Sequence, residues 1–145
     1  MPPPGPFEQY TLKRTPIKQG FPQMANGLNF FSKMCYALYS KNELIHVSYL
    51  YTNVFINYLF GYKGYLVIGD CFTKSEYRGK GLYPKMLKFI ANENNKNIVI
   101  YVSATNNDSI KGIEKAGFQI EKKLIIYKLY RLPIYWKQIP FNSLY

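Results

Sequence analysis

Residues 65–90 read YLVIGDCFTKSEYRGKGLYPKMLKFI, and this stretch decides the fold. Its first part, Tyr65 to Thr73, is apolar and predicts a strand, while apolar residues at i, i+4, i+7 and i+8 from Leu82 predict an amphipathic helix. The turn between them, residues 78–81, is rich in glycine, which lets backbone N–H groups crowd around an anion at the helix N-terminus. We therefore expect a strand, turn and helix unit whose turn binds phosphate.

The segments that follow extend this pattern. Asn97 to Ser103 is apolar on both faces, which predicts a central parallel strand buried from both sides. Thr105 to Asp108 supplies capping residues for a second helix, which ends at Gly117. Phe118 to Lys122 and Leu124 to Leu132 predict a closing hairpin. The order strand, helix, strand, helix predicts parallel pairing through right-handed crossovers.

Two strand-like runs precede this region, Met34 to Ser40 and Leu44 to Leu50, and the polar residues between them predict a hairpin. Alternation along the second run places His46 and Ser48 on the same face. A hairpin contributes antiparallel strands beside the parallel pair. The fold class that we expect is therefore α/β with a mixed sheet.

The length of 145 residues and a hydrophobic content of 48% predict one domain with a core of its own. We place this domain at residues 34–132. Residues 1–33 are rich in proline and are typical of an N-terminal arm, with a short strand near Tyr10 to Arg14. Residues 133–145 form an aromatic C-terminal tail, which we expect to pack on the same domain or on a partner subunit in a homodimer.

Charge and cysteine usage exclude several classes of function. Lysine and arginine number 19 against 8 acidic residues, but the lysines are scattered, so nucleic-acid binding is the least favoured hypothesis. No stretch reaches the ~20 apolar residues of a membrane span, and the N-terminus lacks the pattern of a signal peptide, which predicts a cytoplasmic protein without a membrane partner. One histidine and two cysteines without a C-x-x-C spacing argue against a metal site.

Two motifs in this framework resemble those of the GNAT superfamily of acyl-CoA-dependent N-acyltransferases. The cofactor motif of that family, commonly Y-R-G-K-G-I-G, corresponds to residues 77–83, which read YRGKGLY. A second family pattern, N-x-x-A followed after seven residues by G-F, corresponds to residues 106–109, which read NNDS, and to Gly117-Phe118. The resemblance covers residues 34–132, and the chain is also similar to small bacterial members associated with surface-glycan pathways.

The resemblance implies a GNAT-type fold, in which helices flank a central sheet whose two parallel strands splay apart. Acetyl-CoA would be the co-substrate. Backbone N–H groups from Arg78 to Tyr83 would hold its pyrophosphate, Arg78 or Lys80 would add charge, and the pantetheine arm would lie between the splayed strands. The cofactor-binding residues that the resemblance implies are Cys71, Phe72, Thr73, Arg78, Gly79, Lys80, Gly81, Leu82, Tyr83, Asn106 and Ser109.

Two positions depart from the family pattern. Tyr83 replaces the small residue that usually ends the cofactor motif. Ile113 stands where many members carry the tyrosine that protonates the coenzyme A thiolate. Tyr101, Ser103 and Tyr127 are alternative proton donors, and Tyr127 is the one that we include among the expected catalytic residues.

The general base is also missing from its usual place. Family members often carry it at positions that match Val67 and Gly69 here, and neither residue titrates. His46 is the only histidine and can accept a proton near neutral pH, so it is our candidate base, ahead of Asp70. We interpret Cys71 as a small packed residue rather than a nucleophile.

The expected activity is transfer of an acetyl group from acetyl-CoA to a small-molecule primary amine by direct attack on the thioester. An amine of pKa ~7.8 is neutral about once in seven molecules at pH 7, whereas a lysine amine of pKa ~10.4 is neutral about once in 2,500. Because strong acid and base side chains are missing from their usual positions, we expect an amino sugar or its nucleotide-linked form as acceptor. The alternatives are a protein N-terminal or lysine acetyltransferase and a catalytically silent acyl-CoA-binding module.

Overall fold

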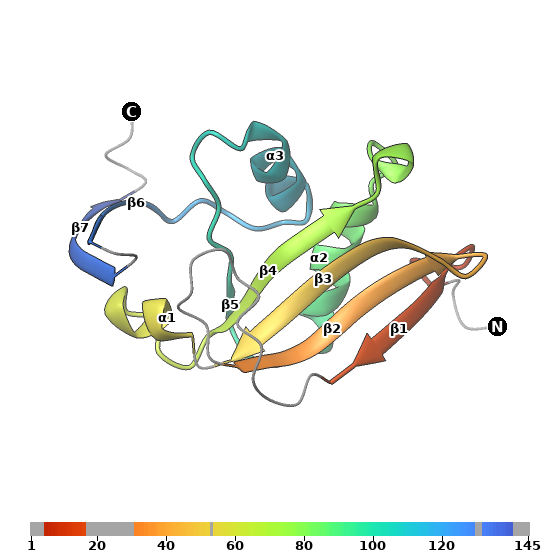
Figure 1. The fold of residues 1–145 in the computed structure, drawn as a ribbon, viewed down its shortest axis with the longest axis horizontal. Coiled ribbons are helices and arrows are strands. Elements are labelled where there is room, and N and C mark those ends of the chain that lie inside the picture. The colour runs from red at the N-terminus through yellow and green to blue at the C-terminus, as the bar shows by residue number, and fades with distance from the viewer. Residues whose placement is uncertain (1–4, 17–30, 53, 130–131, 141–145) are drawn as a thin grey trace. The chain divides into compact units, whose positions relative to one another are not determined.

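The computed structural model describes residues 5–16, 31–52, 54–129 and 132–140, with side chains described at 5–16, 34–52 and 54–123. The chain divides into two compact units, Met1–Tyr101 and Val102–Tyr145. Across the part that the structure describes, the fold is mixed α/β, with a five-stranded mixed sheet, a two-stranded sheet and three α-helices (Figure 1). No helix in this part is long and apolar enough to cross a membrane.

The first unit contains the mixed sheet, whose strands lie in chain order. They are β1 (Thr11–Thr15), β2 (Phe31–Ser40), β3 (Glu43–Thr52), β4 (Leu66–Thr73) and β5 (Ile98–Val99). The first four strands pair antiparallel, and β4 pairs parallel with β5. The expected mixed sheet is therefore confirmed, and β1 confirms the short strand predicted in the N-terminal arm.

The hairpin of β2 and β3 turns at Lys41 and Asn42, whose φ angles are +48° and +72°. Two consecutive residues with positive φ are typical of a type I′ turn, whose twist matches that of the flanking strands. This confirms the predicted hairpin. A register shift between Leu38 and Tyr39 interrupts the strict alternation, and Ile45 and His46 are both fully buried although they are consecutive.

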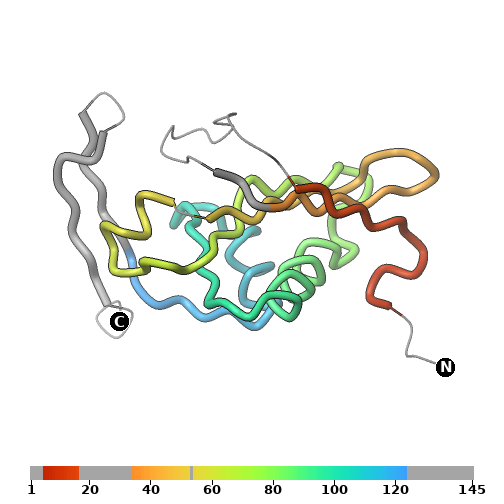
Figure 2. Tube along the Cα trace, turned by 90° about the horizontal axis from the view of Figure 1, so that it is seen from below, coloured from red at the N-terminus to blue at the C-terminus, as the bar shows by residue number. Residues whose placement is uncertain are grey.

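Helix α2 (Leu82–Glu93) covers one face of this sheet, where it packs against β3 and β4. It lies behind the sheet in Figure 1 and below it in Figure 2. The predicted amphipathic pattern is confirmed, and burial of each large apolar side chain stabilises the fold by roughly 1.5–3 kcal/mol. The buried residues of the helix are Leu82, Met86, Leu87 and Ile90.

Strand β5 differs from the long central strand predicted over residues 97–103. It has two residues, both half-buried, and within the described part of the sheet it lies at the edge beside β4. The apolar run has another cause, because Val99 and Tyr101 pack against a buried cluster of Tyr51, Val54 and Val67. A continuous apolar run indicates that its side chains are buried. Side chains can be buried without every residue of the run pairing in a sheet.

Two short helices complete the first unit. Helix α1 (Phe55–Leu59) lies between β3 and β4, within the segment that the sequence indicated only as an aromatic connection. The 3-10 helix η1 (Ser75–Tyr77) follows β4 and leads into the glycine turn.

The second unit contains helix α3 (Asn107–Lys115) and a hairpin of β6 (Lys122–Leu129) and β7 (Leu132–Pro140). The predicted start and end of the helix are confirmed, since Asn106 caps it and Gly117 follows it with a φ of +95°.

The predicted closing hairpin is confirmed only in part: the strand predicted over Leu124 to Leu132 corresponds largely to β6, but the strand predicted over Phe118 to Lys122 is wrong. Residues 118–121 form no strand, and the segment that we expected to be a tail supplies β7 as far as Pro140, while residues 141–145 lie outside the described residues. Prolines at 133 and 140 made this segment resemble a loop. A two-stranded sheet has only edge strands, which tolerate proline because no second neighbour needs its N–H group.

Candidate functional site

The glycine turn before α2 presents unpaired backbone donors. Gly79 and Gly81 both have a φ of +74°, a conformation that other residues adopt only at a cost. The first helical hydrogen bond runs from Lys85 N to Gly81 O at 3.2 Å. Within the described residues, no acceptor bonds the N–H groups from Gly79 to Tyr83. Open donors at the positive end of a helix dipole are an arrangement that suits an anion, the role that the sequence analysis expects for this turn.

Basic side chains flank this turn. The Arg78 Nε donates to the carbonyl oxygen of Thr73 at 2.9 Å, which ties the turn to the last residue of β4. The Lys80 Nζ lies 4.8 Å from the centroid of the Tyr77 ring. Both side chains are exposed, so they add positive charge to the surroundings of the N–H groups without burying it.

Strand β4 has a parallel neighbour over only two of its residues. Only Leu66 and Val67 pair with β5, although β4 continues to Thr73. The edge of β4 that faces β5 is therefore unpaired over most of its length within the described residues. Main-chain groups along an unpaired strand edge are free to hydrogen-bond an extended ligand.

The other edge of β4 carries a bulge. Tyr49 pairs with Gly69 and Val47 pairs with Phe72, so Asp70 and Cys71 together oppose the single residue Ser48. Asp70 has a φ of +48°. An extra residue in one strand bends it and redirects the neighbouring side chains. The bulge therefore changes the simple alternation on which the sequence prediction for Asp70 and Cys71 depended.

His46 lies in a buried hydrogen-bonded group. Its Nδ1 is 2.6 Å from the Thr73 Oγ1, and its Nε2 is 2.8 Å from the Ser48 Oγ. The side chain has no exposed surface, and burial lowers the pKa of His46 from 6.5 to about 4. The predicted common face of His46 and Ser48 is confirmed. Because both ring nitrogens are occupied by hydroxyl groups, His46 can exchange a proton only through Ser48 or Thr73.

Cys71 and Tyr83 border the same group. Burial raises the pKa of the Cys71 thiol to about 11, so the thiol stays protonated at neutral pH and is a poor nucleophile. The Tyr83 ring lies 6.3 Å from the His46 ring, centroid to centroid, and burial raises the pKa of Tyr83. The residue that departs from the family motif therefore packs beside the buried histidine. Phe72, by contrast, is exposed.

The structure adds one pair that the sequence analysis missed. The Tyr51 hydroxyl donates to the Asp70 Oδ2, and burial is the main cause that raises the pKa of Tyr51. The Tyr49 ring lies 6.2 Å from the Tyr51 ring between centroids. The only signal in the sequence is that both tyrosines share one face of β3. Their position opposite the Asp70 bulge depends on the register between β3 and β4, which the sequence does not show.

The predicted site residues fall in both units. The first unit brings together His46, Thr73 and the turn from Arg78 to Tyr83. Asn106 and Ser109 belong to the second unit, where the Asn106 side chain accepts a hydrogen bond from the Ser109 N–H at 3.2 Å as the cap of α3. Tyr127 lies in β6, and its side chain is outside the described residues.

Of the other two proton donors that we considered, Tyr101 lies in the first unit, where its hydroxyl donates to the Asn57 Oδ1 at 2.7 Å. Ser103 bonds to Thr105 in the second unit, with 3.0 Å between the two hydroxyl oxygens. Neither arrangement tests a role in proton transfer, so both residues remain alternatives.

Comparison with known proteins finds no matching family model, no matching curated protein and no matching solved structure. Among the described side chains, no group of three or more His, Cys, Asp or Glu residues is placed to hold a metal ion. The function is therefore inferred from the residues themselves and their geometry.

Proposed function

We propose that the chain is an acetyl-CoA-dependent N-acetyltransferase of the GNAT type, which acetylates a small primary amine. One observation carries the proposal: within the described residues, no acceptor bonds the five N–H groups of residues 79–83, and this turn follows a strand that pairs with its parallel neighbour over only two residues. The turn suits the pyrophosphate of coenzyme A, and the unpaired edge of β4 suits the pantetheine arm. Both features support the GNAT resemblance that the motifs suggest.

The acetyl thioester would lie near the bulge at Asp70 and Cys71. The neutral amine nitrogen would attack the thioester carbonyl carbon, negative charge would develop on the carbonyl oxygen, and the C–S bond would break as the oxygen charge returns to the carbonyl. Water would take the proton that the nitrogen loses and would protonate the departing coenzyme A thiolate. N–H groups of the bulged strand would stabilise that charge, and holding both reactants together would supply much of the acceleration. No acyl-enzyme forms in this scheme, in agreement with the protonated Cys71 thiol.

His46 would contribute little as a base. Its pKa of about 4 keeps the ring neutral at pH 7, but a group with so low a pKa gains little from taking a proton from an ammonium ion. An acceptor of lowered pKa, such as an amino sugar or its nucleotide-linked form, removes most of this need. His46 therefore serves mainly to hold Thr73 and Ser48 in place.

A catalytically silent acyl-CoA-binding module is the second candidate. Two observations favour it: Ile113 cannot donate a proton, and both nitrogens of the buried His46 already have hydrogen-bond partners. Such a module would bind coenzyme A through the same turn and would release no thiol.

Thiol release and direct binding separate these candidates. Release of coenzyme A from acetyl-CoA should be measured with amino sugars, nucleotide-linked amino sugars, peptides and polyamines, beside calorimetric titration with coenzyme A. Release with one class of acceptor would support the enzyme. Binding without release across the panel would favour the silent module, and no binding would overturn the cofactor assignment.

Two lysine variants test the turn itself. Lys80→Ala should weaken coenzyme A binding by about tenfold, because one charged group near the phosphates is lost. Lys88→Ala is the matched control, since Lys88 is an exposed lysine further along α2. Equal affinity of the two variants would show that the Lys80 charge does not contribute to coenzyme A binding.

A further inference from the structure

Among the residues that the structure describes, Asp70 is a carboxylate without a cationic partner. The Tyr51 hydroxyl bonds its Oδ2, and within the described residues its Oδ1 has no partner. The ion pairs of this part of the chain involve Glu43, Glu76 and Glu93. In a chain of formal charge +11, an exposed carboxylate that no described lysine or arginine neutralises can attract an external cation.

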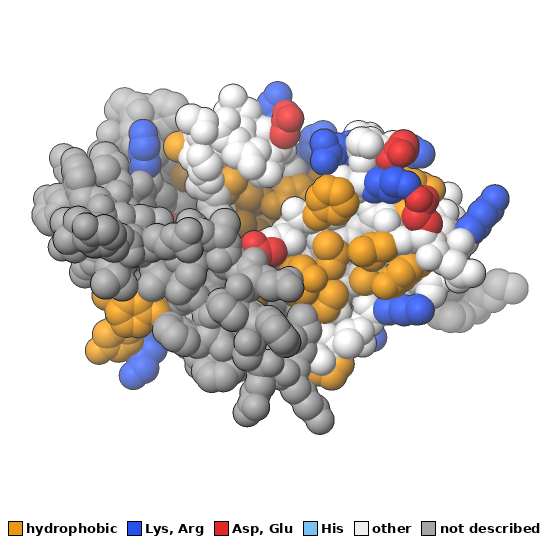
Figure 3. Space-filling model, in the orientation of Figure 1, with side chains coloured by type: hydrophobic (Ala, Val, Ile, Leu, Met, Phe, Trp, Pro, Cys, Tyr) orange, Lys and Arg blue, Asp and Glu red, His pale blue; other side chains and the backbone are white. Residues whose placement is uncertain are grey.

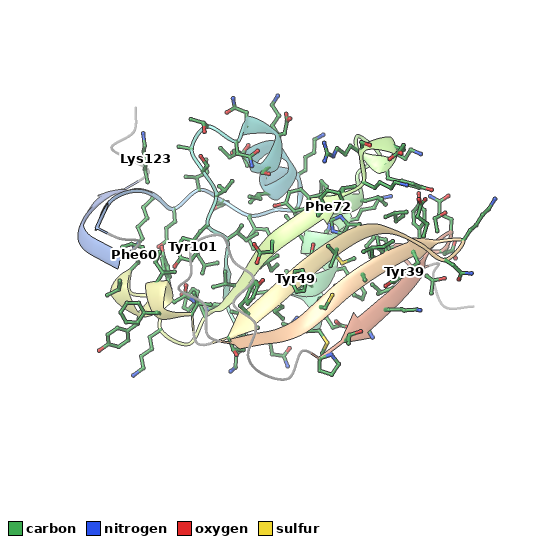
Figure 4. All side chains as sticks on the ribbon, viewed as in Figure 1. Tyr39, Tyr49, Phe60, Phe72, Tyr101 and Lys123 are labelled. Carbon is green, nitrogen blue, oxygen red and sulfur yellow. The ribbon has the colours of Figure 1, made fainter. Side chains whose placement is uncertain are left out.

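Aromatic side chains fix this carboxylate in place. Tyr51 is only 6% exposed and belongs to the buried cluster with Val54 and Val67, so its hydroxyl is held rigidly against Asp70. Tyr49 is partly exposed and lies beside Tyr51. Figure 4 shows Tyr49 on β3 in the middle of the sheet, and Figure 3 shows hydrophobic side chains gathered on the same side of the molecule.

A fixed carboxylate oxygen beside tyrosine rings is suited to an ammonium group. The oxygen accepts a charge-assisted hydrogen bond, and the ring faces attract the cation and the carbon atoms attached to it. We propose that Asp70, held by Tyr51 and flanked by Tyr49, binds a primary ammonium group, and that this group is the amine of the acceptor. The second part rests on the proposed acetyltransferase function.

The position of Asp70 in the strand supports its assignment to the acceptor. It directly precedes Cys71, Phe72 and Thr73, the residues proposed to lie beside the pantetheine arm. The positive φ at the bulge accompanies a side chain that reaches Tyr51 on β3. An ammonium group bound here lies next to the strand segment where the thioester is expected, and it must give one proton to the Asp70 carboxylate or to water before its nitrogen attacks.

A binding experiment without coenzyme A tests the amine site. Backbone N–H signals should be followed by NMR during titration with n-butylamine hydrochloride, and with 1-butanol as the uncharged probe. We expect saturable shifts at residues 49–51 and 69–71 with butylamine and none with butanol. Absence of saturable shifts at these residues, or equal shifts with both probes, would overturn the proposal.

Two charge-matched variants locate the site. Asp70→Asn should weaken butylamine binding tenfold or more, while Glu8→Gln, which removes an exposed charge elsewhere in the first unit, should leave it unchanged. Asparagine tolerates positive φ about as well as aspartate, so Asp70→Asn is expected to keep the bulge. Unchanged binding by Asp70→Asn would contradict the assignment.

Kinetics separate this inference from the proposed function. In an active enzyme, Asp70→Asn should raise KM for the amine at least tenfold and leave the Kd of coenzyme A unchanged. Tyr51→Phe, which keeps the charge but frees the carboxylate, should raise KM less. If the protein binds the amine but shows no turnover, the amine site at Asp70 stands and the proposed acetyltransferase activity is wrong. If the enzyme is active and Asp70→Asn leaves KM for the amine unchanged, the activity stands and the amine site at Asp70 is wrong.

Discussion

At the scale of single residues, His46 shows how burial sets chemical character. The ring lies between the hydroxyl groups of Thr73 and Ser48, and burial lowers its pKa to about 4. A neutral imidazole can donate through one nitrogen and accept through the other, which satisfies both hydroxyl partners without a buried charge. His46 therefore stabilises the end of β4 that leads into the glycine turn.

The lowered pKa predicts that acid destabilises the fold through His46. In the unfolded chain His46 binds a proton below pH 6.5, whereas in the folded chain it stays neutral until about pH 4. The contribution of neutral His46 to the free energy of unfolding is therefore complete above pH 6.5 and is lost as the pH falls towards 4. The loss at pH 4 is about 3 kcal/mol, from 1.36 kcal/mol for each pH unit. Urea unfolding of the wild type and of His46→Gln, at pH 7, 5.5 and 4.5, measures it.

Glutamine can still bond both hydroxyl groups but does not titrate, so the two proteins should differ in the slope of unfolding free energy against pH. Carboxyl groups titrate equally in both and cancel in the comparison. Parallel slopes would show that the His46 pKa is close to its ordinary value.

At the scale of elements, the junction of β4, the turn and α2 depends on backbone geometry. Gly81 is the N-cap residue of α2 and has a φ of +74°. Because glycine has no side chain, it cannot cap the helix, and the first helical N–H groups stay open. Most helices satisfy these groups with a polar cap. Leaving them unsatisfied costs stability and creates the proposed anion site.

Replacement of Gly81 should therefore cost stability through φ alone. A Cβ at Gly81 would meet no atom within 4 Å, so Gly81→Ala should lower the free energy of unfolding by about 1 kcal/mol without a clash. Gly81→Asn should cost less, since asparagine tolerates this region. Gly5→Ala, also without neighbours within 4 Å of its Cβ, is the control. The midpoints of urea unfolding measure the stability of the three variants. An equal loss of stability in Gly81→Ala and Gly5→Ala would contradict the prediction.

At the scale of the whole molecule, a ligand that binds only the folded chain must raise its stability. If coenzyme A binds at the turn, a concentration of 100 times its Kd adds ~2.7 kcal/mol to the free energy of unfolding. For a chain of this length, that corresponds to a rise in Tm of roughly 8 °C. Differential scanning fluorimetry with coenzyme A measures the shift.

Pantetheine is the matched probe for this measurement, because it keeps the thiol arm but lacks the pyrophosphate that should bind residues 79–83. We expect it to raise Tm much less than coenzyme A, and we expect added salt to reduce the effect of coenzyme A. A pantetheine shift as large as that of coenzyme A would place the binding energy away from the turn.

Local patterns allowed much of the fold to be predicted. The hairpin at Lys41, the helix from Leu82 and the cap at Asn106 depend on turn residues, helical periodicity and capping groups that lie within a few residues of each other. Strand β7 could not be placed in this way, because prolines allow either a loop or an edge strand and only pairing decides between them.

The sequence by itself determined the mixed α/β class, the glycine turn before α2 and the common face of His46 and Ser48, because each depends on neighbours along the chain. Only the tertiary structure decided that β5 pairs over two residues, that Asp70 lies in a bulge against Tyr51 and that His46 is buried. Strand register and burial depend on contacts between segments far apart in the chain, and no local pattern determines those contacts.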